Sequence, residues 1–394
     1  MRNHLFLTLS LFLSLITFIA KAQNPVLLGQ DTTRRPINTA VPFMMIAPDA
    51  RSSGMGDVGV ATSADVNAGH WNAAKLVFLE NKFGASLSFS PWLRKYVNDM
   101  SISYLSAYYK VDKLNAFAFD LRYFNLGSIT FTDNGGSIIR DFTPREFAIS
   151  VYYSRKLSDN LSVGVGGRFI NSNLSADLIV GSSSQVETRP GNTGAADISI
   201  YYQSDEMDLM GLPAQLRLGA NISNIGAKIS YTSSGERDFI PMNLRLGTAL
   251  TTNIDVYNKF TFALDINKLL VPTPPQINSQ GAIVKGRNPR DVSVVQSLFT
   301  SFADAPDGFS EEIKEFTLGI GVEYWYDDMV AARLGYFTES ADKGGRKYFS
   351  IGAGIRYNMF GLDISYLIPQ NQNNPLAETL RFSFLFDFND EAKR

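Results

Sequence analysis

Large apolar residues alternate with small, polar or charged residues along most of the chain after residue 80. The clearest cases are residues 117–124, 147–154, 260–267 and 316–325. Successive side chains of a β-strand point to opposite faces, so a period of two predicts strands with one apolar and one polar face. The polar face of these segments carries Asp120, Arg122, Asp265, Arg333 and Arg356. The pattern therefore predicts an all-β fold.

Segments of this kind number about fourteen, and each has about the length that a tilted strand needs to cross a bilayer. We expect them at 82–91, 100–110, 114–125, 145–156, 161–172, 194–203, 214–223, 243–252, 258–268, 314–326, 329–338, 347–357, 359–368 and 378–388. A soluble β-sandwich would also alternate, but its apolar faces would have to cover each other, whereas lipid covers the apolar face of a membrane barrel. The sequence thus predicts a transmembrane antiparallel β-barrel over residues 82–388.

The lengths of the connections support the barrel over the sandwich. Long connections at 126–144, 173–193, 224–242 and 269–313 alternate with short ones such as Asp327-Asp328. Outer-membrane barrels have short periplasmic turns and longer external loops. The fold of a sandwich does not require long and short connections to alternate. The last segment carries Leu380, Phe382, Phe384, Phe386 and Phe388 at alternate positions, and a short tail at 389–394 follows it.

The first residues predict export. Arg2 precedes an apolar run from Leu5 to Ala20, and Ala20-Lys21-Ala22 is typical of a signal-peptidase site. We therefore expect a signal peptide at 1–22 and localisation in the outer membrane as an integral barrel. The 394 residues include 28 Phe and 17 Tyr but no Cys, which excludes disulfides and thiol chemistry.

Residues 23–81 lack the alternation and contain Gly54-Met55-Gly56-Asp57-Val58-Gly59, which matches the G-x-G-x-x-G dinucleotide fingerprint. That fingerprint requires a strand before it and a helix after it, whereas Pro48 lies upstream here. A barrel of fourteen strands encloses more space than its own side chains fill. We interpret residues 23–81 as an N-terminal plug, or hatch, inside or beneath the barrel.

Little in the sequence favours catalysis. His70 is the only histidine after the expected signal peptide, so no multi-histidine metal site can form, and we expect neither a cofactor nor an enzyme. Asp120 and Arg122 lie on the same lumen-facing side of one predicted strand, and we expect their charges to be balanced within the lumen. A formal net charge of −2 and the lack of a Lys/Arg cluster argue against a nucleic-acid partner.

The longest predicted loop, residues 269–313, is the candidate binding element. After the proline-rich stretch Val271–Pro275, apolar residues recur at near-helical spacing: Val292, Val295, Leu298, Phe299 and Phe302. Two interpretations are open, because this amphipathic helix could pack on the barrel mouth or dock a partner.

Several motifs resemble a known family. Met55-Gly56-Asp57 and Trp71-Asn72-Ala73-Ala74 resemble the N-terminal region of FadL-like barrels, although Ala73 stands where those barrels commonly have Pro. The stretches 219–226 and 241–247 are similar to the PorV (LptO) family of the type IX secretion system, and the sister PorQ barrels share some of these motifs.

The resemblance implies a fourteen-stranded barrel that associates with the SprA/Sov-type translocon. It also implies that the barrel binds secreted cargo proteins through their C-terminal signal domain and shuttles them to the PorU-type attachment complex at the cell surface. The family motifs assign none of these contacts to residues of this chain. The alternative function is a FadL-like transporter for long-chain fatty acids or other hydrophobic molecules, and a third is a purely structural role in a complex.

Overall fold

The computed structural model of the chain describes residues 34–94, 97–132, 135–174, 179–180, 186–232, 235–278, 282–370 and 379–388. The chain divides into two compact units, Met1–Arg34 and Arg35–Arg394, and every helix and strand named below belongs to the second. The expected signal peptide at 1–22 and the expected tail at 389–394 lie outside the described residues.

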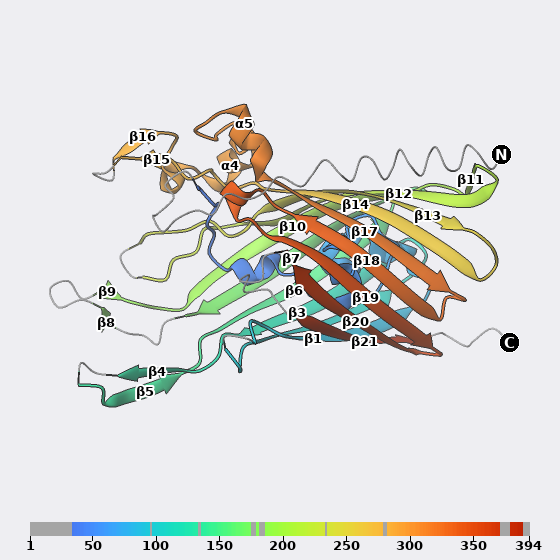
Figure 1. Cartoon of the computed structure of the whole chain (residues 1–394), viewed down its shortest axis with the longest axis horizontal. Coiled ribbons are helices and arrows are strands. Elements are labelled where there is room, and N and C mark those ends of the chain that lie inside the picture. Colours follow the sequence, from blue (N-terminus) through green and yellow to red (C-terminus); the bar gives the residue numbers. More distant parts are fainter. Residues whose placement is uncertain are drawn as a thin grey trace. The chain divides into compact units, whose positions relative to one another are not determined.

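The second unit is an antiparallel β-barrel (Figure 1). Its main sheet has fifteen strands, of which the short β11 (Met207–Leu209) pairs with β12 alone and the other fourteen form a closed ring. The ring strands are β1 (Phe83–Pro91), β2 (Ser101–Lys110), β3 (Asn115–Asn125), β6 (Arg145–Lys156), β7 (Leu161–Asn173), β10 (Gly191–Gln203), β12 (Leu212–Gly226), β13 (Asn243–Asn253), β14 (Asn258–Leu269), β17 (Phe316–Tyr326), β18 (Val330–Thr338), β19 (Lys347–Tyr357), β20 (Phe360–Pro369) and β21 (Leu380–Phe388). Pairing of β1 with β21 joins the two ends of the strand sequence and closes the ring.

The two faces of the barrel wall differ as the alternation predicts. On β3, Phe117 and Phe119 are exposed on the outside, whereas Asp120 and Arg122 are buried on the inside. Most ring strands repeat this pattern, and exposed Phe, Leu, Ile and Val side chains line the outer face. An apolar outer face around a polar interior is typical of a barrel embedded in lipid. Among the described residues, no helix is long and apolar enough to cross a membrane.

Short turns join the strands at one end of the barrel and long segments join them at the other. The β17–β18 turn is the clearest short one: Asp327 and Asp328 both have positive φ, 53° and 50°, as a two-residue type I′ hairpin requires. The long segments contain two-stranded hairpins and short helices, which gather at one end of the barrel in Figure 1. These elements are β4 (Ile129–Thr132), β5 (Ile138–Phe142), β8 (Ile179–Val180), β9 (Val186–Glu187), β15 (Gln276–Ile277), β16 (Ile283–Lys285), η3 (Pro289–Asp291), α4 (Val294–Thr300), α5 (Phe309–Glu312), η4 (Ile313–Glu315) and η5 (Ala341–Lys343).

The segment before β1 lies inside the barrel, as the sequence predicts for a plug. Its helical turns are η1 (Pro42–Met45), α2 (Ala50–Ser53), α3 (Ala68–Trp71) and η2 (Ala73–Phe78). The α2 turn contacts β19, β20 and β21, whereas η2 contacts β6, β7 and β10 on another part of the ring. Residues from Val41 to Leu79 therefore bridge the lumen, and most of their side chains are buried.

The Gly54–Gly59 stretch lets the plug backbone approach the barrel wall. Gly56 has φ 73°, and a Cβ there would lie 2.7 Å from the backbone nitrogen of Tyr336. Across this contact, a Cβ on Gly335 would lie 2.0 Å from the Gly56 nitrogen. Gly56 of the fingerprint-like stretch thus serves close backbone packing against β18.

Candidate functional site

The external segment between β14 and β17 holds the predicted binding helix. The Ser293 hydroxyl begins α4 by accepting a hydrogen bond from the Gln296 backbone nitrogen at 3.1 Å. The helix ends at Thr300 and covers much of the predicted apolar repeat, while Val292 and Phe302 flank it. The sequence pattern therefore located this element, though the helix is shorter than the repeat.

The five predicted residues divide between two faces of this element. Val292 is buried and Leu298 is half-buried, and both pack in a cluster with buried apolar residues at the barrel mouth. By contrast, Phe299 is 76% exposed, Val295 is 68% exposed and Phe302 is 43% exposed. One face of the element thus packs on the barrel mouth, and the other is exposed. Docking of a partner on the exposed face stays a prediction.

Apolar exposure continues beyond α4. Phe309 on α5 is 78% exposed, and Ile313 at the start of η4 is exposed as well. We refer to the five side chains Val295, Phe299, Phe302, Phe309 and Ile313 as the loop surface. Sequence reasoning missed Phe309 and Ile313, although their i, i+4 spacing after Pro306 was a usable signal.

Buried ion pairs fix the base of the loop surface to the barrel. The Lys268 ammonium on β14 contacts Glu312 Oε1 at 2.6 Å and Glu315 Oε2 at 2.7 Å. Lys343 in η5 contacts Glu311 Oε1 at 2.7 Å and Glu315 Oε1 at 2.9 Å. Three carboxylates from one short stretch therefore meet two lysines from different elements, which positions α5 and η4 rigidly.

Three carboxylates in this region resemble a cation site. Oxygens of Asp304, Glu312 and Glu315 all lie within 4.8 Å of one another. The Lys268 ammonium already bonds two of them and supplies the positive charge that a metal ion would bring. Burial raises the pKa of Asp304 to about 6, the Thr273 hydroxyl opposes this shift, and the charges of Glu315 and Glu312 add to it. The arrangement fits an internal ionic cluster better than a metal site.

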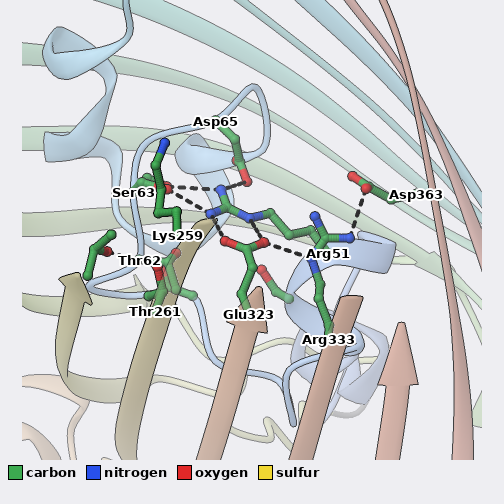
Figure 2. Close-up of polar contacts among 12 residues, drawn as sticks. Arg51, Thr62, Ser63, Asp65, Lys259, Thr261, Glu323, Arg333 and Asp363 are labelled. Atoms are coloured by element: carbon green, nitrogen blue, oxygen red, sulfur yellow. Dashed lines mark hydrogen bonds and ion pairs between the residues drawn. The ribbon is translucent and has the colours of Figure 1, made fainter. Parts of the chain in front are cut away.

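A second ionic network crosses the lumen and joins the plug to the barrel (Figure 2). The Glu323 carboxylate on β17 accepts from Arg51 of the plug at 2.7 Å and from Arg333 on β18 at 2.7 Å. Arg51 also contacts Asp65 at 2.9 Å, and Arg333 contacts Asp363 on β20 at 2.9 Å. Arg51, Glu323, Arg333 and Asp363 are all buried, so their charges are compensated within the lumen.

Asp120 and Arg122 face the lumen as expected but form no ion pair with each other. The Arg122 guanidinium instead donates to the plug carbonyls of Phe43, Met44 and Ile46 at 3.0–3.1 Å. The plug therefore supplies acceptors for Arg122 that no strand pattern reveals. Asp120 accepts hydrogen bonds from two tyrosine hydroxyls of neighbouring strands.

His70 is buried beside the same arginine. Its Nδ1 lies 3.1 Å from Arg122 Nη2, so the ring accepts from a guanidinium and stays neutral. Its ring also meets Trp71 and Tyr104 edge-on. The lone histidine therefore packs within the plug as a structural residue.

Two cavities flank the plug. The larger, about 550 Å³, is lined at the short-turn end by charged and polar residues that include Arg51, Arg217, Lys259 and Asp387. The smaller, about 320 Å³, lies at the long-loop end, between the plug and strands β13, β14, β17 and β18.

Several solved structures are similar to the chain. The chain is similar to a TodX deltaS2S3 mutant monoaromatic hydrocarbon channel at 12% identity and a TM-score of 0.49, over 86% of this chain and 99% of that one. It is also similar to a Pseudomonas aeruginosa FadL homologue, at 11% identity and a TM-score of 0.47 over 90% and 100% of the two chains. The Ralstonia pickettii toluene transporter TbuX gives 12% identity and a TM-score of 0.47 over 86% and 98%. Curated proteins gave no match.

A family model decides the assignment. The model described as "Type IX secretion system protein PorV" matches residues 29–276, which is more than half of the 394 residues and includes the plug and the strands through β14. The chain therefore belongs to the PorV family of the type IX secretion system.

Proposed function

We propose that this outer-membrane barrel binds secreted proteins on its external face and carries them from the translocon to the surface attachment complex. Membership of the PorV family supports a role in type IX secretion. The observation that carries the finer proposal is the loop surface, a set of exposed apolar side chains on a rigidly anchored external segment. Exposed apolar clusters on otherwise polar surfaces are typical of protein-interaction sites.

The filled lumen supports binding at the rim over passage through the barrel. The plug contacts strands on different parts of the ring, and its Arg51 is paired with Glu323 of the wall. A polypeptide in transit would have to break the Arg51–Glu323 pair, and leaving such charges unpaired in the interior costs several kcal/mol (about 3–5). A carrier that holds its cargo outside avoids that cost.

The proposed partners follow from the family. The cargo would be recognised through its C-terminal signal domain, a SprA/Sov-type translocon would deliver it, and a PorU-type attachment complex would receive it. Apolar anchors near the centre of an interface commonly supply most of its binding energy. Phe299 and Phe309 are the most exposed aromatic residues of the loop surface and are the proposed anchors.

The fatty-acid transporter remains the alternative prediction. It would need an apolar route through the lumen, and the cavity at the short-turn end is lined largely by charged and polar side chains. Uptake of labelled fatty acid by cells, with and without the gene, separates this alternative from the carrier proposal.

Alanine variants test the loop surface. We expect Phe299→Ala combined with Phe309→Ala to weaken capture of cargo bearing the C-terminal signal by about 30-fold or more, because each truncation removes an interface anchor worth about 1–2 kcal/mol. Capture is measured by pull-down on the purified barrel, and folding by the barrel's heat-dependent migration on gels.

Leu298→Ala is the matched control, since Leu298 is on the same helix but packs on the barrel mouth. It should weaken the loop's packing without removing an anchor. Normal capture by the double variant would overturn the proposed surface.

A further inference from the structure

The smaller cavity has the size and lining of a ligand site. Its volume of about 320 Å³ is at the low end of the range usual for small-molecule sites, about 300–1,000 Å³. Apolar walls come from Ile37, Met45, Leu269 and Phe337. The cavity reaches the solvent, because the exposed Pro36 is part of its rim.

Arg245 brings this cavity a buried positive charge that no direct ion pair neutralises. The residue lies on β13, faces the interior and is 7% exposed. Its Nη1 is buried without a hydrogen-bond partner. Among the described residues no ion pair involves its guanidinium, and the carboxylates of Asp265, Asp57 and Asp197 act on it only from a longer distance. The Asn243 amide oxygen, turned towards it, accepts from Nε at 3.0 Å. The guanidinium stacks on the Trp71 ring, 4.8 Å from its centroid.

The other cations of the cavity are paired. Arg346 contacts both oxygens of Glu339, at 2.9 and 3.0 Å, and Lys343 holds Glu311 and Glu315. Burying a charge is costly unless it is paired and hydrogen-bonded. A bound anion would supply the missing partner of Arg245 and recover that cost.

We propose that this cavity binds a carboxylate that carries an apolar substituent, with Arg245 as its counter-charge. The planar guanidinium can grip a carboxylate through two parallel hydrogen bonds. The apolar walls then hold the substituent next to it. The C-terminal residue of a polypeptide and a small free acid share this chemistry, so the site does not depend on cargo capture by the loop surface.

Two acids and one ester test the site on the full-length barrel in lipid nanodiscs. The probes are N-acetyl-phenylalanine, its methyl ester and 3-phenylpropionate, and binding is measured by calorimetry and by the fluorescence of Trp71, which lines the cavity. We expect saturable binding of at least one acid and not of the ester. Arg245→Met should weaken that binding by about tenfold or more, because hydrogen bonds to a charged group are lost. Arg245→Lys keeps the positive charge but not the planar guanidinium that makes two parallel hydrogen bonds, so it should give an intermediate affinity.

Arg217→Met is the matched control. Arg217 lies on the neighbouring β12, is also buried, and lines the other cavity, where it donates to the neutral side chain of Thr251 at 2.6 Å. It should leave binding unchanged. Equal binding of both acids supports a site for free carboxylates, and binding of N-acetyl-phenylalanine alone supports a polypeptide C-terminus. Equal binding of the ester, no saturable binding of either acid, or equal losses in Arg245→Met and Arg217→Met would overturn the proposal.

Discussion

Glu323 illustrates how single residues hold this molecule together. Its carboxylate is buried between the guanidiniums of Arg51 and Arg333, one from the plug and one from the wall. Each charge is tolerated in the interior only because the others neutralise it. The stability of the plug in the barrel therefore depends on a few side chains whose partners the alternating pattern does not identify.

Removing this carboxylate should be costly. Glu323→Ala leaves two buried guanidiniums facing each other, and we expect the free energy of unfolding to fall by about 3–5 kcal/mol. The measurement is urea unfolding in lipid vesicles, followed by the fluorescence of Trp325 next to Arg333.

The control for Glu323→Ala is Glu236→Ala, which removes an exposed ion pair with Arg290. Exposed pairs contribute at most about 1 kcal/mol, so this variant should unfold almost as the parent does. Similar losses in the two variants would show that the lumen network is not the stabilising element.

At the scale of elements, the alternating pattern located the strands but not the plug that fills the barrel. Each ring strand overlaps its predicted span, because lipid on one side and lumen on the other impose a period of two. The largest differences are at β10 and β12, which extend three residues further towards the long-loop end, to Gly191 and Gly226. The plug could be predicted only because residues 23–81 lack this period of two.

The candidate site was predictable in part for the same reason. A helical repeat identified α4, but which of its faces packs depends on distant residues such as Phe239 and Met242. The sequence predicts Arg122 and Asp265 only as charges on the polar face of their strands. Whether a partner neutralises them depends on the irregular plug segment, whose path no periodicity encodes.

The segment between β14 and β17 should respond to pH through Asp304. The pKa of Asp304 is raised to about 6 in the folded loop, against about 4 for an unperturbed Asp. The folded loop thus holds the proton more tightly than the unfolded loop, so this contribution to stability is full below pH 4 and is lost as the pH rises towards 6. Hydrogen–deuterium exchange of residues 294–315, corrected for its intrinsic pH dependence, should show protection falling over that interval.

Asp304→Asn should abolish this step, because the amide does not titrate. Asp291→Asn, an exposed position in the same external segment, should retain it. A step of the same size in Asp304→Asn would assign the pH response to another group.

The whole molecule combines a closed ring with a bridged interior, which suits a rigid platform for external binding. A disulfide can test whether the plug has to move. Ser53 of the plug and Ser365 of β20 have hydroxyl oxygens 3.1 Å apart, and the chain has no Cys of its own. Side chains this close are compatible with disulfide geometry.

Ser53→Cys combined with Ser365→Cys should therefore lock the plug to the wall on oxidation. If cargo is held outside, cells with the oxidised variant should secrete type IX cargo at the parental rate, measured by cargo in the medium. Secretion that stops on oxidation and resumes with reductant, while Ser53→Cys alone is unaffected, would show that plug displacement is part of the cycle.

The close fit between Gly56 and Gly335 also constrains how the molecule is made. Backbones packed too tightly for a single methyl group leave no clearance for a preformed plug to slide past the wall into place. The plug precedes β1 in the chain, and the ring of strands is closed only when β1 pairs with β21. We expect the plug to fold first and the strands to assemble around it, with the pairing of β1 and β21 formed last. Variants that replace Gly335 with a larger residue should therefore stop biogenesis before the barrel closes.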